Sequence, residues 1–166
     1  NVTRIDAAHK EIEIDGQSLA ADAMVIALGA DYAPEAIPGL ATAGLNIYTM
    51  DGAGAIRDAL TRFKGGRIVI LTAAPMYKCP AAPYEASLLV DAFLRKHGLR
   101  DKTTIEFFAA EPRPMFVAGP ELGAAVRGMV EAQGIAYHPE HQVKEVDPAA
   151  HRVTFASGAT AEYDLL

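Results

Sequence analysis

The stretch Gly65-Gly66-Arg67-Ile68-Val69-Ile70-Leu71-Thr72 decides the fold. Its glycines interrupt any preceding helix, and the apolar run that follows them is short enough for a buried strand. Residues 83–97 have helical spacing of apolar side chains, and residues 103–109 form a second strand-like run. A strand, a helix and another strand in this order predict an α/β fold with a parallel sheet and crossover helices.

Further helices are expected on both sides of this stretch. Asp51 is suited to cap one that ends before Gly65, and Pro120 is suited to open one that stops at Gly134. A short strand should follow at 135–137. The side chains expected to face inward from the three helices are Ile56, Leu60, Phe63, Leu88, Leu89, Ala92, Phe93, Leu122, Val126, Met129 and Val130.

The two ends of the chain resemble each other. Residues 5–10 read Ile-Asp-Ala-Ala-His-Lys, and residues 146–152 read Val-Asp-Pro-Ala-Ala-His-Arg. Each is followed by alternating apolar residues and a glycine turn, which is typical of a hairpin. We therefore expect a duplicated unit with a small antiparallel β-meander. Residues 23–28 should form a buried strand after the first copy, and the chain should be an internal part of a longer protein.

The composition limits the classes of function. The chain has 166 residues, 51% of them hydrophobic, and a net charge of −6. It can bury a core, and its charge gives no reason to expect nucleic acid or an anionic lipid surface. A single cysteine excludes an intrachain disulfide and a multi-cysteine metal site. His138 and His141 have Pro139 between them, which favours a solvated loop over a metal pair, so we expect no metal site.

The loop after the strand lacks a dinucleotide fingerprint. Such a fingerprint needs glycines directly after the strand, for a tight turn and close approach to pyrophosphate. Residues 72–81 contain no glycine. Asp51-Gly52-Ala53-Gly54 resembles part of a fingerprint but does not follow a strand, so it is interpreted as a helix start. The sequence predicts that this unit does not bind NAD(P) in the usual way.

Cys79 stands in this loop, between prolines and ahead of a helix expected to begin at Pro83. The positive end of the helix dipole, with Lys78 beside it, would favour a thiolate. A buried, inert cysteine is the alternative. Glu85 has two interpretations as well, a residue that complements the helix dipole or a general acid/base close to the sulfur. Tyr77 and Tyr84 could line an aromatic wall or pack in the core.

Three motifs together resemble the flavoprotein group of sulfide:quinone oxidoreductases and flavocytochrome c sulfide dehydrogenases. The first is Val25-Ile26-Ala27-Leu28-Gly29-Ala30 ahead of Ile37-Pro38-Gly39-Leu40, and the second is Gly65-Gly66-Arg67-Ile68-Val69-Ile70. The third, Lys78-Cys79-Pro80-Ala81-Ala82-Pro83-Tyr84-Glu85, is the most specific. The resemblance implies a Rossmann-like fold of the FAD/NAD(P)-binding type. Residues 1–45 would be the end of an FAD-type unit with a connector, and residues 46–166 a second, NAD(P)-binding-like unit.

The resemblance also implies roles for single residues. Cys79 would be one of a redox pair whose second cysteine lies in a later segment, and Glu85 would be the nearby acid/base. Gly29, Ala30 and Pro80 would lie at the flavin. FAD would belong to the longer protein and would not be retained by this chain alone. Sulfide or a related sulfur compound would be the substrate, and a quinone or a cytochrome would be the acceptor.

Other functions stay open at this point. One is an NAD(P)H-dependent FAD reductase of the same fold, and another is a non-catalytic scaffold with an inert cysteine. A homodimer and peripheral membrane association are expectations for the longer protein, as is a place on a bacterial membrane surface or in the periplasm.

Overall fold

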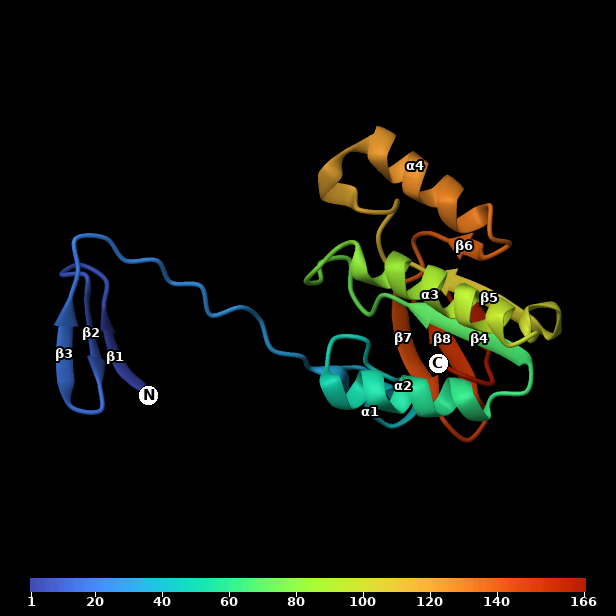
Figure 1. Ribbon diagram of the computed structural model, residues 1–166, viewed down its shortest axis with the longest axis horizontal. Helices are drawn as coiled ribbons and strands as arrows, with labels where there is room; N and C mark the ends of the chain where they lie inside the picture. The colour runs from blue at the N-terminus through green and yellow to red at the C-terminus, as the bar shows by residue number, and fades with distance from the viewer. The chain divides into compact units, whose positions relative to one another are not determined.

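The computed structural model describes all 166 residues, in two compact units, Asn1–Tyr32 and Ala33–Leu166 (Figure 1). The first unit is a three-stranded antiparallel meander of β1 (Val2–Asp6), β2 (Glu11–Ile14) and β3 (Gln17–Ala20). The second unit contains η1 (Pro34–Ala36), α1 (Leu40–Ala43), α2 (Met50–Arg62), β4 (Gly66–Leu71), α3 (Ala82–Lys96), η2 (Arg100–Lys102), β5 (Thr103–Phe108), η3 (Phe116–Ala118), α4 (Pro120–Glu131), β6 (Ala136–His138), β7 (Val143–Asp147), β8 (Arg152–Phe155) and β9 (Thr160–Glu162).

A parallel sheet lies at the centre of the second unit. β4 pairs with β5 and β5 pairs with β6, all in parallel, and α3 and α4 are the crossover helices. The segment Asp164–Leu166 lies along the other side of β4, where the backbone N–H of Val69 donates to the carbonyl of Leu165 at 2.9 Å. The α/β, Rossmann-like fold predicted from the sequence is confirmed.

The strand residues alternate between two cores, as the pleat of a sheet requires. Ile68 and Phe107 join a core that includes side chains of α2, α3 and α4. Val69 and Phe108 point to the other face, where they pack with Val143, Val146, Val153 and Phe155 of the second meander. The sheet is therefore buried on both faces, which explains why its strands read as continuous apolar runs.

The two meanders have the same strand register. In the first, Val2 pairs with Ile14 and Ile5 with Ile12, with an irregularity between Val2 and Arg4. In the second, the corresponding pairs are Val143 with Phe155 and Val146 with Val153, with an irregularity between Val143 and Glu145. The internal repeat expected from the sequence is therefore also a repeat of structure, down to the position of the bulge.

The buried strand predicted at residues 23–28 is wrong. These residues form no strand, and the side chains of Val25 and Leu28 are 89% and 85% exposed. A strand needs a neighbour to satisfy its backbone, and this segment has no ladder partner in its unit. In the second meander the corresponding residues, Asp164–Leu166, do have a neighbour in β4.

Residues 1–45, predicted as the end of an FAD-type unit with a connector, fall on both sides of the division between the compact units. The chain passes from the first unit to the second after Tyr32. Residues beyond that point bind the second meander and its end. The N–H of Val146 donates to the carbonyl of Pro38 at 2.8 Å, and that of Leu45 donates to Leu166 at 2.9 Å.

Two features of the helices differ from their predictions. The cap of α2 is Thr49, not Asp51, because the Thr49 hydroxyl accepts the N–H of Gly52 at 3.0 Å. In α3, Leu89 and Ala92 are exposed. The residues of α3 that are buried are Pro83, Tyr84, Ser87, Asp91 and Leu94. Polar side chains with partners inside the protein thus take places on the inner face that the sequence analysis gave to apolar residues.

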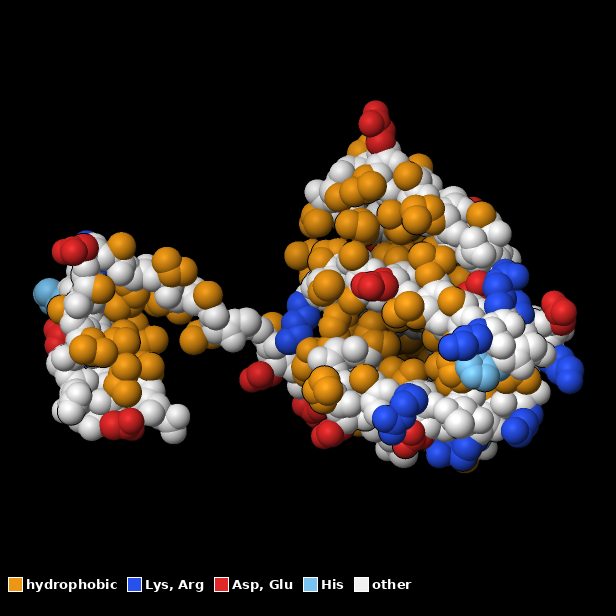
Figure 2. All heavy atoms as spheres, in the orientation of Figure 1, with side chains coloured by type: hydrophobic (Ala, Val, Ile, Leu, Met, Phe, Trp, Pro, Cys, Tyr) orange, Lys and Arg blue, Asp and Glu red, His pale blue; other side chains and the backbone are white.

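The α4 region presents an apolar surface (Figure 2). Leu122 and Met129, both expected to point inward, are 46% and 58% exposed, while Val126 and Val130 do pack in the core. Phe116 and Val117, just before α4, are exposed as well. None of the helices is both long and apolar enough to cross a membrane.

Candidate functional site

Cys79 lies in the loop between β4 and α3, at the carboxyl edge of the parallel sheet. Ligands of open α/β sheets bind outside this edge. The cysteine is exposed, so the buried alternative is wrong. Its backbone is in the left-handed region, with a φ of 52°, and its carbonyl accepts the N–H of Ala82, the first residue of α3, at 3.0 Å. The thiol is thus presented to solvent just ahead of a helix N-terminus.

Three of the predicted site residues, Cys79, Pro80 and Glu85, lie in the loop before α3 and in its first turn. Pro80 is half-buried beside Cys79, and Glu85 is exposed in the first turn of α3. Gly29 and Ala30 belong to the first compact unit. Gly29 has a φ of +73° and open space where a side chain would begin.

Beneath the cysteine loop lies a buried carboxylate that the sequence analysis missed. Glu111 follows β5 and is 2% exposed. One of its oxygens accepts the hydroxyls of Tyr77 and Tyr84, each at 2.5 Å. The other accepts the hydroxyl of Thr72 at 2.8 Å, and that hydroxyl in turn accepts the N–H of Ala110. We call Glu111, Thr72, Tyr77 and Tyr84 the Glu111 cluster.

The cluster perturbs its tyrosines. Burial, and then the hydrogen bond to Glu111, raise the pKa of Tyr77 and of Tyr84 far above the ordinary value of 10.0. Burial also raises the pKa of Tyr137, whose hydroxyl lies 3.4 Å from that of Tyr84, to about 12. The tyrosines therefore remain protonated donors at neutral pH, as a buried carboxylate requires.

Two signals in the sequence could have indicated this cluster. An acidic residue directly after a buried strand is one, since carboxyl ends of parallel strands share an edge. The other is the pair Tyr77 and Tyr84 on the two sides of Cys79. Core packing is one of the two interpretations of these tyrosines, and Tyr84 does pack against Phe107, with ring centroids 4.8 Å apart. Its hydroxyl also donates a hydrogen bond to Glu111.

His138 and His141 differ from their prediction in their surroundings. They do not stand free in a solvated loop. The ring of His138 stacks on Phe108 with centroids 4.5 Å apart, and His141 contacts Phe155 edge-on at 5.0 Å. The Nε2 atom of His138 lies 3.5 Å from a Glu106 oxygen. These contacts assign the two histidines to packing between the sheet and the second meander.

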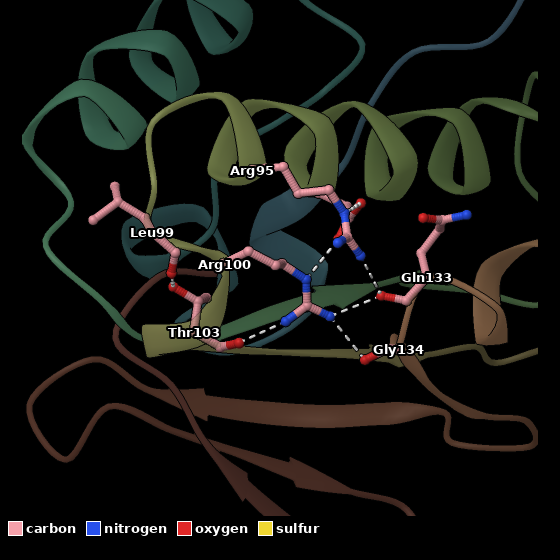
Figure 3. A network of polar contacts seen from close by, with 7 residues as sticks. Arg95, Leu99, Arg100, Thr103, Gln133 and Gly134 are labelled. Carbon is pink, nitrogen blue, oxygen red and sulfur yellow. Dashed lines mark hydrogen bonds and ion pairs between the residues drawn. The ribbon is translucent and has the colours of Figure 1, made fainter.

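A second buried carboxylate lies at the amino end of the same sheet (Figure 3). Asp91 accepts the Nε–H groups of Arg95 and Arg100 at 2.7 and 2.5 Å. Arg100 also donates to the carbonyls of Thr103, Gln133 and Gly134, at the starts of β5 and β6. We call these residues the Asp91 network. It ties α3 to the residues that lead into two strands, and its two guanidinium groups share one carboxylate.

Two features of the chain, each within its own compact unit, are compatible with a flavin in the longer protein. The open space around Gly29 allows a planar ring to approach the backbone closely, which a side chain would prevent. An exposed thiol at the carboxyl edge of a sheet is suited to react with a neighbouring redox group. The expectation that Gly29, Ala30 and Pro80 lie at FAD stays a prediction. The glycine fingerprint that cradles its pyrophosphate is absent from residues 1–166.

Known proteins resemble this chain over nearly all its length. The mitochondrial sulfide:quinone oxidoreductase of Dictyostelium discoideum is 25% identical over 161 residues, which are 92% of this chain and 35% of that protein. The structure of the sulfide:quinone oxidoreductase from Aquifex aeolicus matches with a TM-score of 0.71 and 21% identity, over 96% of this chain and 38% of that one. NDH2 of Plasmodium falciparum, solved with NADH, matches with a TM-score of 0.67 and 16% identity, over 100% and 39%.

The chain thus spans a little over a third of the length of these relatives. The structural matches agree with the fold described above. The sequence model of one family, that of the pyridine nucleotide-disulphide oxidoreductases, matches residues 1–166. The chain therefore belongs to the pyridine nucleotide-disulphide oxidoreductase family.

Proposed function

We propose that this chain is the part of an FAD-dependent oxidoreductase that presents a redox-active cysteine, Cys79, to a sulfur substrate. The substrate is sulfide or a related sulfur compound, and a quinone or a cytochrome accepts the electrons. The observation that carries the proposal is the exposed thiol of Cys79 at the carboxyl edge of β4, where related folds place a phosphate-binding turn.

The chemistry needs a disulfide between Cys79 and a second cysteine of the whole protein. Hydrosulfide attacks one sulfur of that disulfide, a persulfide forms there, and the other sulfur leaves as a thiolate. The N-terminus of α3 supports a thiolate at Cys79. FAD, when bound, supplies the acceptor for the two electrons released as sulfide is oxidised.

The same edge of the sheet is unsuited to a dinucleotide. The loop offers no glycine, and Pro75 lacks an N–H with which to bind phosphate. These features favour a sulfur substrate over NADH, although one structural relative was solved with NADH.

The test uses the full-length protein loaded with FAD and kept without oxygen. Sulfide and NADH are added separately while the flavin absorbance is followed. We expect bleaching by sulfide and not by NADH, and loss of the sulfide response in Cys79→Ser. Bleaching by NADH alone, unchanged in Cys79→Ser, would place the protein among the NADH-dependent reductases and make Cys79 structural.

Glu85 is proposed as the acid/base near the sulfur. Glu121 provides a matched control, because it is an acidic residue in the first turn of α4 as Glu85 is in α3. Both substitutions, Glu85→Gln and Glu121→Gln, remove a favourable dipole interaction of about 0.3–1 kcal/mol. We expect only Glu85→Gln to slow flavin reduction by sulfide, by about 10²-fold. Equal rates in the two variants would leave Glu85 with the dipole role alone.

A further inference from the structure

The side chains of the cysteine loop are mostly exposed. Between residues 74 and 79 every side chain is exposed except that of Tyr77, which is half-buried. Met76, just before it, is 79% exposed. Cys79 itself has a left-handed backbone, which costs a residue with a side chain about 1–2 kcal/mol. Such a conformation persists only where the surroundings impose it.

Hydrogen bonds hold the loop at its two ends and at one point between them. At its start, the N–H of Thr72 donates to the carbonyl of Phe108 at 3.1 Å, and the Ala73 carbonyl accepts the side-chain amide of Gln142 at 2.7 Å. At its end, the Cys79 carbonyl accepts the N–H of Ala82. Between Ala73 and Cys79, the Tyr77 hydroxyl reaches Glu111. This contact fixes the loop two residues from the thiol.

Glu111 joins three parts of the site through hydroxyl groups. Tyr77 belongs to the loop, Tyr84 to the first turn of α3, and Thr72 to the end of β4. Because Tyr77 and Tyr84 bind the same oxygen, the loop and the helix start are held against one atom. A carboxylate can accept several hydrogen bonds at once, which suits this task.

We propose that Glu111 is a positioning residue for Cys79: through Tyr77 it fixes the cysteine loop, and through Tyr84 it fixes the N-terminus of α3 that supports the thiolate. This assignment rests on the proposed function for its consequence in catalysis, but not for its effect on the loop. Glu111 does not touch the substrate in this scheme. It determines where the sulfur stands.

The test separates the position of the sulfur from the stability of the fold. In the full-length protein, cysteines other than Cys79 are replaced and a nitroxide spin label is attached to Cys79, whose mobility is read by electron paramagnetic resonance. Tyr77→Phe removes one hydrogen bond to Glu111. Thr103→Val is the matched control, because it removes one hydroxyl hydrogen bond, to Leu99, that is part-buried like that of Tyr77 but lies at the other end of the sheet.

We expect the mobile population of the label to rise about tenfold in Tyr77→Phe and to stay unchanged in Thr103→Val, because one lost buried hydrogen bond shifts a local equilibrium by about that factor. Glu111→Ala should match Tyr77→Phe in mobility. Equal label mobility in Tyr77→Phe and Thr103→Val would overturn the assignment.

Flavin reduction by sulfide, measured on the unlabelled Tyr77→Phe protein with its cysteines intact, completes the design. A slower reaction with a more mobile label supports both proposals. If the label becomes more mobile in Tyr77→Phe but sulfide does not reduce even the unsubstituted protein, the proposed function is removed and the positioning role is retained. If the label stays immobile in Tyr77→Phe while sulfide reduction depends on Cys79, the positioning role is removed and the proposed function is retained.

Discussion

The two ends of the parallel sheet each bury one carboxylate, but with different donors. At the amino end, Asp91 is bound by the guanidinium groups of Arg95 and Arg100. At the carboxyl end, the hydroxyls of Thr72, Tyr77 and Tyr84 bind Glu111. Because its donors are charged, the first site stabilises the fold by linking α3 to the residues before two strands. At the second site, neutral hydroxyl donors link the carboxyl group to the cysteine loop through Tyr77.

The largest loss of stability should come from the amino end. Arg100→Ala leaves Asp91 buried with one partner and frees the carbonyls that Arg100 binds, which should cost about 3–5 kcal/mol of the free energy of unfolding. Arg95→Ala removes a half-exposed partner and should cost about 1 kcal/mol or less. Urea unfolding followed by circular dichroism measures both. Equal costs would show that the network has no buried centre.

Removing the carboxylate at the other end should cost less. Glu111→Ala deprives three hydroxyls of their acceptor, and we expect a loss of about 2–4 kcal/mol in urea unfolding. Glu111→Gln keeps one acceptor oxygen and should lose about half as much. If Glu111→Ala is as stable as the parent, the cluster is not a significant part of the fold.

Alkaline pH should weaken the carboxyl end selectively. The pKa of Tyr77, Tyr84 and Tyr137 is raised in the folded state, so their contribution to stability is complete below pH 10 and is lost as pH rises further, through about 12 for Tyr137. Each tyrosine should add about 1.4 kcal/mol per pH unit to the decline. Urea midpoints measured from pH 9 to 12 test this, and Tyr84→Phe should flatten the curve. An unchanged slope in Tyr84→Phe would contradict the assigned shift.

The smallest loss of stability should come from Tyr137, which lies at the edge of the Glu111 cluster. The hydroxyls of Tyr137 and Tyr84 are 3.4 Å apart, a long contact, so Tyr137→Phe should cost about 0.5 kcal/mol or less. Tyr84→Phe, which removes a 2.5 Å bond to Glu111, should cost about 1–2 kcal/mol. Thermal unfolding of the two variants compares them directly. Similar losses would extend the cluster to β6.

Much of the fold could be predicted because its signals are local. The apolar run from Ile68 to Leu71 and the helical spacing after it require only neighbouring residues, and so do the two meanders. The buried strand at 23–28 was wrong because burial of a strand depends on a neighbouring strand, which an apolar run alone does not specify.

The two carboxylate sites could not be predicted in the same way. Tyr77 and Glu111 are 34 positions apart, and Arg100 and Gln133 are 33 apart, so each contact depends on how β4, β5 and β6 align. The position of Cys79 at the sheet edge was predictable from strand and helix order alone. The residues that hold it in place become visible only once that order is folded.

The pairing of Asp164–Leu166 with β4 also has a consequence for the order of folding steps. The backbone N–H of Arg67 donates to the Asp164 carboxylate at 2.7 Å, across 97 positions of the chain. At translation rates of about 5–20 residues per second, Asp164 is synthesised roughly 5–20 s after β4. During that time one side of a very apolar strand has unpaired backbone groups, which is a hazard for aggregation. Closing so long a loop is also entropically costly, so the pairing of Asp164–Leu166 with β4 should form late in folding.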